Sequence, residues 1–258
     1  MATRFTSSLK SNCMKSNQNR IGEISISNQG EKMVIESYKT CHDFWVRFEN
    51  GYLKHSKKYN RFLDGGIFNP TYPSVYGVGM IDYEKSDASK HKAYRHWYQI
   101  IQRCYDKINR SYDDVTVCDE WLHFKNFEKW FNDNYYEVDG QRMCVDKDLI
   151  DKHSRIYSPS TCVILPQNIN KMLIKQQFKR GKYPIGVFFD KRRNTFYSNL
   201  YVDNKLCSKS GFTNPNDAFI FYKTNKERMI KEMANKYKDQ IPQKVYDAMY
   251  NYQVDITD

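Results

Sequence analysis

The sequence predicts an α+β protein, and three observations support this fold class. Between residues 21 and 70, apolar and polar residues alternate in short runs, which is the period of half-buried strands. From residue 94 to 108, apolar residues return every three to four positions, as on one face of a helix. Residues 183–237 combine three strand-like runs with a long helical stripe. We therefore expect a basic arm (1–20), a small β domain (21–75), a helix-supported module (88–174) and a C-terminal domain (183–240).

The charge of the chain is concentrated in two places. The 258 residues carry a net charge of +11, and residues 1–20 contribute four Lys and Arg with no acid. Residues 171–210 hold ten Lys and Arg against Asp190 and Asp203. A clustered positive charge favours an anionic partner, so double-stranded DNA is the first candidate.

Composition also bears on the compartment. No apolar run reaches the roughly 18 residues that a membrane span needs, and residues 1–20 lack the apolar core of a secretory signal. The seven cysteines are scattered without a C-x-x-C spacing. These features predict no membrane partner, free thiols and a cytoplasmic setting.

The first β domain is predicted from its turns and its alternation. Residues 24–38 offer two strands about Asn28-Gln29-Gly30, and residues 44–56 offer two more about Asn50-Gly51. The Asn-Gly pair predicts a type I′ turn, in which both central residues have positive φ. Phe44, Val46 and Phe48 should form the buried face of their strand. Residues 74–90 should form a linker.

Two helices are predicted between residues 90 and 136. The first carries an apolar stripe of Tyr94, Trp97, Ile101, Cys104, Tyr105 and Ile108. The second runs through residues 119–136, with Trp121, Phe124, Phe127, Trp130 and Phe131 on one face. Aromatic stripes at helical spacing predict core packing rather than a ligand site.

Residues 183–237 predict a three-stranded meander followed by a helix. In the middle strand Phe196, Ser198, Leu200 and Val202 should face the helix, and Tyr197, Asn199 and Tyr201 should face outwards. Asn214 and Pro215 predict the helix start, because Asn caps free N–H groups and Pro suits the first helical position. The helix should bury Ala218, Phe221, Tyr222, Met229 and Met233. The outward face, beside the basic turn 191–193, has the side-chain types that read a DNA groove.

The stretch "YPIGVFFDKRRNTFYSNLYVDNKLCSKSGFTNPNDAFIFYK" resembles the AP2 DNA-binding domain of phage and mobile-element proteins. The similarity lies in Gly186-Val187, the turn 190–193, Gly211-Phe212 and Tyr222-Lys223. It implies a sheet that lies in the DNA major groove. Ser210 departs from the pattern, which usually has an apolar residue there. The DNA-binding residues predicted from the charge and from this resemblance are Lys175, Lys179, Arg180, Lys182, Lys191, Arg192, Arg193, Tyr197, Asn199, Tyr201 and Lys205.

The fragments "YRHWYQIIQRCY", "VCDEWLHF" and "MCVDKDLIDKHSRIYSPSTCVILPQNIN" resemble the frame of HNH-type phage homing endonucleases, in a subgroup with an altered core. That resemblance implies a ββα-metal module that uses Mg²⁺ or Mn²⁺. The strands would be residues 143–146 and 162–165, and Pro166 would open the helix. Asp146 and Asn170 match the metal positions.

The position that normally holds the catalytic histidine is Lys147. A free lysine, with a pKa near 10.4, is a poor base at neutral pH. Lys147 and, from the adjoining loop, His153 are the candidate catalytic residues. Three functions follow as alternatives: a DNA-binding nickase, a DNA-binding regulator that does not cleave, and a protein that inhibits a host enzyme through residues 21–75.

Overall fold

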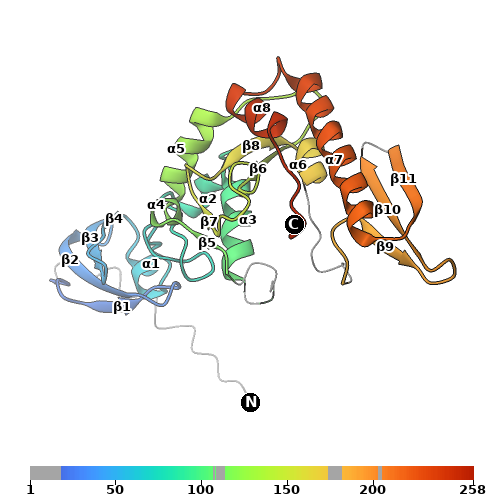
Figure 1. Cartoon of the computed structure of the whole chain (residues 1–258). Helices are drawn as coiled ribbons and strands as arrows, with labels where there is room; N and C mark the ends of the chain where they lie inside the picture. The colour runs from blue at the N-terminus through green and yellow to red at the C-terminus, as the bar shows by residue number, and fades with distance from the viewer. Residues whose placement is uncertain (1–18, 107, 109–113, 174–181, 203–204) are drawn as a thin grey trace. The chain divides into compact units, whose positions relative to one another are not determined.

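The structure, a computed structural model, describes residues 19–106, 108, 114–173, 182–202 and 205–258 (Figure 1). It combines helices with several small sheets, which confirms the α+β class. The described residues form two compact units. Unit 1 comprises the residues up to 108 together with 119–129, and unit 2 comprises 114–118 and the residues from 130 onwards. This division differs from the four segments expected from the sequence.

Unit 1 begins with a four-stranded antiparallel sheet in the order β1-β2-β3-β4. Its strands are β1 (Ile24–Ile26), β2 (Lys32–Thr40), β3 (Asp43–Phe48) and β4 (Leu53–Ser56), and the short helix α1 (Tyr59–Leu63) follows. Phe44, Val46 and Phe48 are buried and pack with Tyr59 and Phe62. The alternation predicted for β3 is confirmed, because its apolar positions face α1.

The turn between β3 and β4 is not the predicted type I′ turn. Gly51 has a φ of 83°, whereas Asn50 is not among the residues with positive φ. The loop is longer than two residues, because the Phe48 N–H donates to the Tyr52 carbonyl at 2.9 Å. The Asn50 side chain accepts from the Tyr52 N–H at 3.0 Å and so stabilises the wider turn.

Residues 74–90 are not the linker that their composition predicts. Val75, Ile81 and Ala88 are buried, and α2 (Lys85–Ala88) lies in this stretch. Met80 pairs with His123 as an isolated parallel bridge. The segment is therefore packed into unit 1.

That bridge also explains why the predicted helix over 119–136 is divided. The Met80 N–H donates to the Leu122 carbonyl, and the Phe124 N–H donates to the Met80 carbonyl. These backbone groups are lost to the helix, which separates α4 (Asp119–Leu122) from α5 (Phe124–Asn134). The preceding helix α3 (Tyr94–Tyr105) buries Trp97 and Ile101 as predicted, but Ile108 lies beyond its end and is exposed.

Unit 2 contains a ββα arrangement. Strands β6 (Met143–Asp146) and β8 (Val163–Pro166) pair antiparallel, and α6 (Gln167–Leu173) follows directly. Pro166 ends the strand instead of opening the helix. A second small pair, β5 (Thr116–Val117) with β7 (Ile156–Tyr157), is parallel. The first strand of that pair comes from the short segment 114–118.

The C-terminal sheet has the order β11-β10-β9 and is antiparallel. Its strands are β9 (Val187–Asp190), β10 (Thr195–Val202) and β11 (Lys205–Phe212). Figure 1 shows α7 (Pro215–Tyr237) alongside this sheet, and Ser198 and Leu200 are buried on β10. The predicted start of α7 is confirmed, since the Asn214 side chain accepts from the Asn216 N–H at 2.8 Å.

The packing of α7 corrects part of the predicted stripe. Ala218, Tyr222 and Met233 are buried as expected, whereas Phe221 and Met229 are only half-buried. The helix passes very close to the sheet at Gly186, where a Cβ atom would lie 2.0 Å from the Tyr222 ring. Gly186 also has a φ of 74°, which favours glycine.

Helix α7 is fastened to the ββα arrangement by polar contacts. Lys226 is buried and its Nζ donates to the Met172 carbonyl oxygen. Burial lowers the pKa of Lys226 to about 8. The Asn168 amide donates to the Tyr237 hydroxyl at 2.5 Å. The ββα arrangement and the C-terminal sheet therefore belong to one packed body, unit 2.

The last helix, α8 (Gln243–Tyr250), was not predicted from the sequence. It packs against α7, with Val245 and Met249 buried. Among the described residues, no helix is both long and apolar enough to cross a membrane.

Candidate nucleic-acid interface and candidate acidic site

The face of the C-terminal sheet that α7 does not cover is built by the pairing register of its strands. Tyr197 lies opposite Phe188 on one side and Ser210 on the other. Asn199 lies opposite Ser208, and Tyr201 lies opposite Leu206. Because cross-strand partners point to the same side of a sheet, these residues share the open face. Phe188 is 45% exposed, Tyr201 66% and Leu206 61%, whereas Tyr197 is half-buried.

Two contacts organise this face. The Phe188 and Tyr197 rings stack with centroids 5.3 Å apart and an interplanar angle of 21°. The Ser208 hydroxyl donates to Asn199 Oδ1 at 2.6 Å. That bond orients the amide, whose side-chain N–H groups donate to no described residue. Asn199 is therefore held in one orientation with both a donor and an acceptor available, as base-edge recognition requires.

A basic turn closes one end of the open face. Asp190 Oδ1 accepts from the Arg192 N–H at 2.9 Å and from the Arg193 N–H at 3.3 Å. Asn194 completes the turn with a φ of 51°. The Lys191, Arg192 and Arg193 side chains are exposed. A shallow hollow of about 470 Å³ lies between this turn and Tyr197, Ser208 and Ser210.

The other predicted DNA-binding residues are distributed differently. Lys182 is exposed, with Nζ 5.3 Å from the centre of the Tyr183 ring. Lys175, Lys179 and Arg180 lie outside the described residues, and only the backbone of Lys205 is described. Sequence reasoning missed Phe188, Leu206, Ser208 and Ser210. The alternation of residues in β9 and β11 could have indicated them. It assigns these residues to the open face only when the pairing of both strands with β10 is known.

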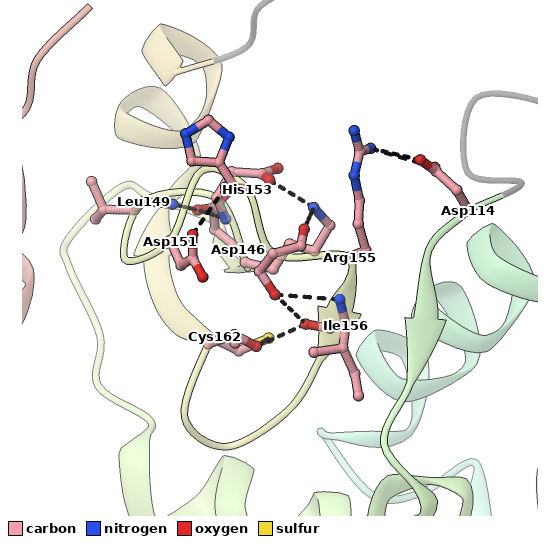
Figure 2. Close-up of polar contacts among 12 residues, drawn as sticks. Asp114, Asp146, Leu149, Asp151, His153, Arg155, Ile156 and Cys162 are labelled. Carbon is pink, nitrogen blue, oxygen red and sulfur yellow. Dashed lines mark hydrogen bonds and ion pairs between the residues drawn. The ribbon is translucent and has the colours of Figure 1, made fainter.

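The second candidate site lies at the end of β6 (Figure 2). Asp146 Oδ1 accepts from the Asp148 N–H at 3.0 Å and from the Leu149 N–H at 2.8 Å. Asp146 Oδ2 has no hydrogen-bond partner in the part of the chain described. Burial, and then the charge of Asp148, raise the pKa of Asp146 to about 6. The carboxylate is therefore only incompletely satisfied by the protein.

The Lys147 ammonium group does not donate a hydrogen bond to the Asp146 carboxylate. It is 6% exposed, and Nζ donates to Asp148 Oδ1 at 2.6 Å and to the Ser154 carbonyl at 3.0 Å. These bonds tie the two ends of the 148–154 loop together. An ammonium group held as a donor to two oxygens has no lone pair with which to take a proton. The geometry favours a loop-fastening role over a general base.

His153 and Asn170 are not drawn into the site by hydrogen bonds. His153 is exposed, and its backbone N–H donates to Asp151 Oδ1 at 3.0 Å. Asn170 lies half-buried on α6, and its side chain makes no hydrogen bond with the described residues. Their catalytic and metal-binding roles stay predictions.

Few side chains near Asp146 could bind a metal ion. Among the described residues, no three His, Cys, Asp or Glu side chains gather closely enough to hold an ion. Asp146 Oδ2 and the Asn170 amide oxygen are nevertheless hard donors of the kind that Mg²⁺ accepts. Mg²⁺ binds many sites through one or two protein oxygens and keeps several waters. Asp146 and Asn170 therefore have donor types that suit Mg²⁺, and their joint binding of an ion stays a prediction.

A C-terminal segment packs against the same loop. Lys152 Nζ donates to the Gln253 carbonyl, pairs with Asp258 Oδ2 at 2.9 Å and lies 4.3 Å from the centre of the Tyr252 ring. Burial raises the pKa of Tyr252, and Asp258, then Tyr222, and then the charges of Asp146 and Asp148 add to that rise. The segment 252–258 therefore covers part of the loop that carries Lys147.

Comparison with known proteins assigns no function to either of these two surfaces. No protein-family profile, curated protein or solved structure matches the chain. The open sheet face combines exposed aromatic, amide and cationic groups, and the acidic site offers the half-buried Asp146 carboxylate. The functional conclusion rests on that chemistry.

Proposed function

We propose that this protein binds double-stranded DNA through the open face of the β9–β11 sheet, and that its ββα arrangement supports this sheet without cleaving DNA. The observation that carries the proposal is the exposed face itself. One side of the sheet is covered by α7, while the other carries the half-buried Tyr197 and the exposed Asn199 and Tyr201. A solvated face normally carries few large apolar groups, so this concentration favours a binding surface.

The side chains on this face have the chemistry of base readout. The major groove shows donors and acceptors on base edges and a methyl group on thymine. Asn199 supplies an amide, and Ser208 and Ser210 supply hydroxyls. Phe188 and Leu206 supply apolar surface for a thymine methyl. The major groove admits a two-stranded β-ribbon, and the paired strands β10 and β11 would supply one.

The cations lie where they can position the sheet without reading sequence. Lys191, Arg192 and Arg193 lie at the turn that joins β9 to β10, at one end of the face. Arg193 is held only loosely by Asp190, with an Nε–Oδ2 distance of 3.9 Å. Guanidinium groups at a strand end are well placed for phosphate oxygens. The net charge of +11 adds a general attraction for DNA.

The sequence-reading part of the proposal is tested with a preferred duplex selected from a random library. Asn199→Ala should reduce discrimination between that duplex and a mutated one by about 1–3 kcal/mol. Asn132→Ala is the matched control, because Asn132 is an exposed asparagine on α5. Equal discrimination by the native protein and Asn199→Ala would show that the sheet does not read bases.

The positioning part has its own signature. Arg193→Ala should weaken binding to all duplexes alike and reduce the salt slope by roughly 0.9 for each phosphate that the variant no longer neutralises. Lys244→Ala, an exposed cation on α8, is the control. Point variants are preferable to deletion of the sheet, because Lys226 and Tyr237 of α7 bond to α6. An unchanged salt slope for Arg193→Ala would remove the turn from the interface.

A second candidate function is a Mg²⁺- or Mn²⁺-dependent DNA nickase, and the free Asp146 Oδ2 favours it. When bound, the ion would supply neutralisation of charge on the scissile phosphate. Asp146 and Asn170 would hold it. Lys147, bonded to Asp148 and the Ser154 carbonyl, would keep the loop in place but take no proton. A site without a general base typically loses on the order of 10²–10⁴ in rate.

Two measurements separate this candidate from the non-cleaving protein. The ion alone should raise the melting temperature of the native protein and leave Asp146→Asn unaffected, if the site binds it. Conversion of supercoiled plasmid to open circles should then appear, and Lys147→His should accelerate it. No nicking by either protein rules out the nickase and leaves the DNA-binding proposal standing. Nicking that persists in Asp146→Asn would place the chemistry elsewhere.

A further inference from the structure

Unit 1 contains a large cavity lined by tyrosines that plays no part in the surfaces described above. Its volume is about 990 Å³, at the upper end of ordinary ligand sites. Tyr72, Tyr76, Tyr94 and Tyr98 line it, together with Phe68 and the exposed Asn28. No charged side chain lines it. The cavity is therefore suited to flat, uncharged groups with polar edges.

The tyrosines form a connected array. The Tyr76 and Tyr98 rings lie 5.7 Å apart, and their hydroxyls lie 3.5 Å apart. Tyr94 and Tyr98 are 6.1 Å apart. Tyr98 remains 37% exposed, so its ring is accessible from solvent. Tyr94 packs on the buried rings of Trp97 and Phe124, and Tyr98, supported by it, offers an aromatic face to an entering ligand.

One of these rings is carried by a residue with a strained backbone conformation. Tyr76 has a φ of 51°, in the left-handed region that non-glycine residues rarely adopt, and Gly77 follows with a φ of 77°. Such strain costs on the order of 1–3 kcal/mol and is concentrated at binding and catalytic positions. A tyrosine held in this conformation at a cavity wall points to a binding role.

A basic groove adjoins the cavity. Its volume is about 260 Å³, and it shares Gly66, Ile67 and Phe68 with the tyrosine-lined cavity. Lys57, Lys58 and Arg61 line it, are exposed and form no ion pair with the described residues. The one carboxylate in its lining, Glu84, is paired with Lys54. The groove therefore keeps an excess of positive charge beside an uncharged aromatic cavity.

We propose that unit 1 binds single-stranded nucleic acid, with bases stacked on the tyrosines of the cavity and phosphates held along the basic groove. Single strands are recognised by this combination, because every base has a π-face and every linkage has a negative charge. A neutral sugar would have no use for the adjoining cations. A duplex keeps its bases stacked on one another and cannot offer them to a cavity. This site is separate from the duplex-binding face of unit 2.

The test uses the full-length protein and a fluorescent oligothymidylate of about 12 nucleotides, within the usual site sizes. Anisotropy should show binding by the native protein. Tyr98→Ala should weaken it on the order of 5- to 100-fold, the loss typical of one stacked base. Tyr98→Phe keeps the ring and should bind like the native protein. Tyr72→Ala provides a second, independent loss, and thermal melting checks that each variant is folded.

The basic groove is tested by salt dependence. Arg61→Ala should weaken binding and reduce the log–log salt slope by about 0.7 for each phosphate that the variant no longer neutralises. Lys39→Ala and Tyr250→Ala are the controls, because both residues are exposed and lie outside the cavity and the groove. Neither should change single-strand affinity. Tyr98→Ala should also leave affinity for duplex DNA unchanged.

Four results would overturn the proposal. The first is no binding of the single strand by the native protein. The second is native affinity in both Tyr98→Ala and Tyr72→Ala. The third is an equal loss in Tyr98→Phe and Tyr98→Ala, which would assign the contact to the hydroxyl and not to stacking. The fourth is a loss caused by Tyr201→Ala instead, which would transfer single-strand binding to the sheet of unit 2.

Discussion

Replacing Lys226 by methionine should stabilise unit 2 at neutral pH and remove a pH dependence that the native protein has. Lys226 is a buried residue of α7, and its pKa falls from 10.5 to about 8. That shift corresponds to roughly 3 kcal/mol of unfavourable burial of the charged form. The bond to the Met172 carbonyl offsets part of this cost, and losing it leaves a buried acceptor unpaired at about 1–3 kcal/mol. The net gain at pH 7 should be at most about 2 kcal/mol.

The direction of the pH dependence follows from proton counting. Between pH 8 and 10.5 the unfolded chain keeps the lysine proton while the folded protein has lost it. The unfolded state then binds more protons, so native stability rises with pH. With these two pKa values, the rise between pH 7 and 9.5 is roughly 2 kcal/mol. The advantage of Lys226→Met over the native protein should shrink by the same amount.

Urea unfolding followed by circular dichroism at several pH values up to 9.5 measures this difference before tyrosine ionisation interferes. Lys236→Met, an exposed position on the same helix, is the control and should follow the native curve. A stability difference between Lys226→Met and the native protein that stays constant from pH 7 to 9.5 would refute the reasoning. It would mean that Lys226 keeps an ordinary pKa and that α7 is held by other contacts.

Three further substitutions test individual packing and burial arguments, each by its effect on unfolding free energy. Ser198→Ala should be neutral or stabilise by about 1 kcal/mol, because the buried Ser198 hydroxyl has no partner among the described residues; a clear loss would reveal an unseen bond. Gly186→Ala should cost roughly 2–4 kcal/mol, because φ at this position is positive and the added Cβ would overlap the Tyr222 ring. Gly140→Ala is the control and should cost less, because Gly140 has a similar φ but open space around it. Asp146→Asn should stabilise at pH 7 by up to about 3 kcal/mol, because a pKa raised to about 6 means that stability is lost as pH rises from about 4 to 6. The stability difference between Asp146→Asn and the native protein should vanish near pH 4. A difference that persists at pH 4 would show that burial does not raise the pKa of Asp146.

Local patterns predicted much of the secondary structure. The alternation of apolar and polar residues in β3 and β10 identified their buried faces. Every second side chain of a strand points to the same side, so this pattern needs no information from distant residues. Asn214 with Pro215 located the start of α7, because capping depends only on adjacent residues. Features that depend on distant partners were missed or wrong. The division between α4 and α5 depends on Met80, which lies far away in sequence, and no window around residue 123 contains that information.

The candidate sites show the same limit. The shared face of Tyr197, Asn199 and Tyr201 was predicted, since the facing of residues along a single strand is a local property. Their neighbours Ser208 and Leu206 depend on the register with β11. At Lys147 the residue type suggested chemistry, whereas the structure bonds its ammonium to Asp148 and the Ser154 carbonyl. Whether a lysine is free or held is a property of the folded loop.

The parallel pairing of β5 with β7 has a consequence for the history of such a chain. The segment 114–118 belongs to unit 2, yet residues 119–129 return to unit 1. The polypeptide crosses between the units three times, so no single break separates them into two intact pieces. Recombination that exchanged either unit as a cassette would leave β7 without its partner or unit 1 without α4. Exchange of one unit without the other would therefore need three breaks in the chain instead of one.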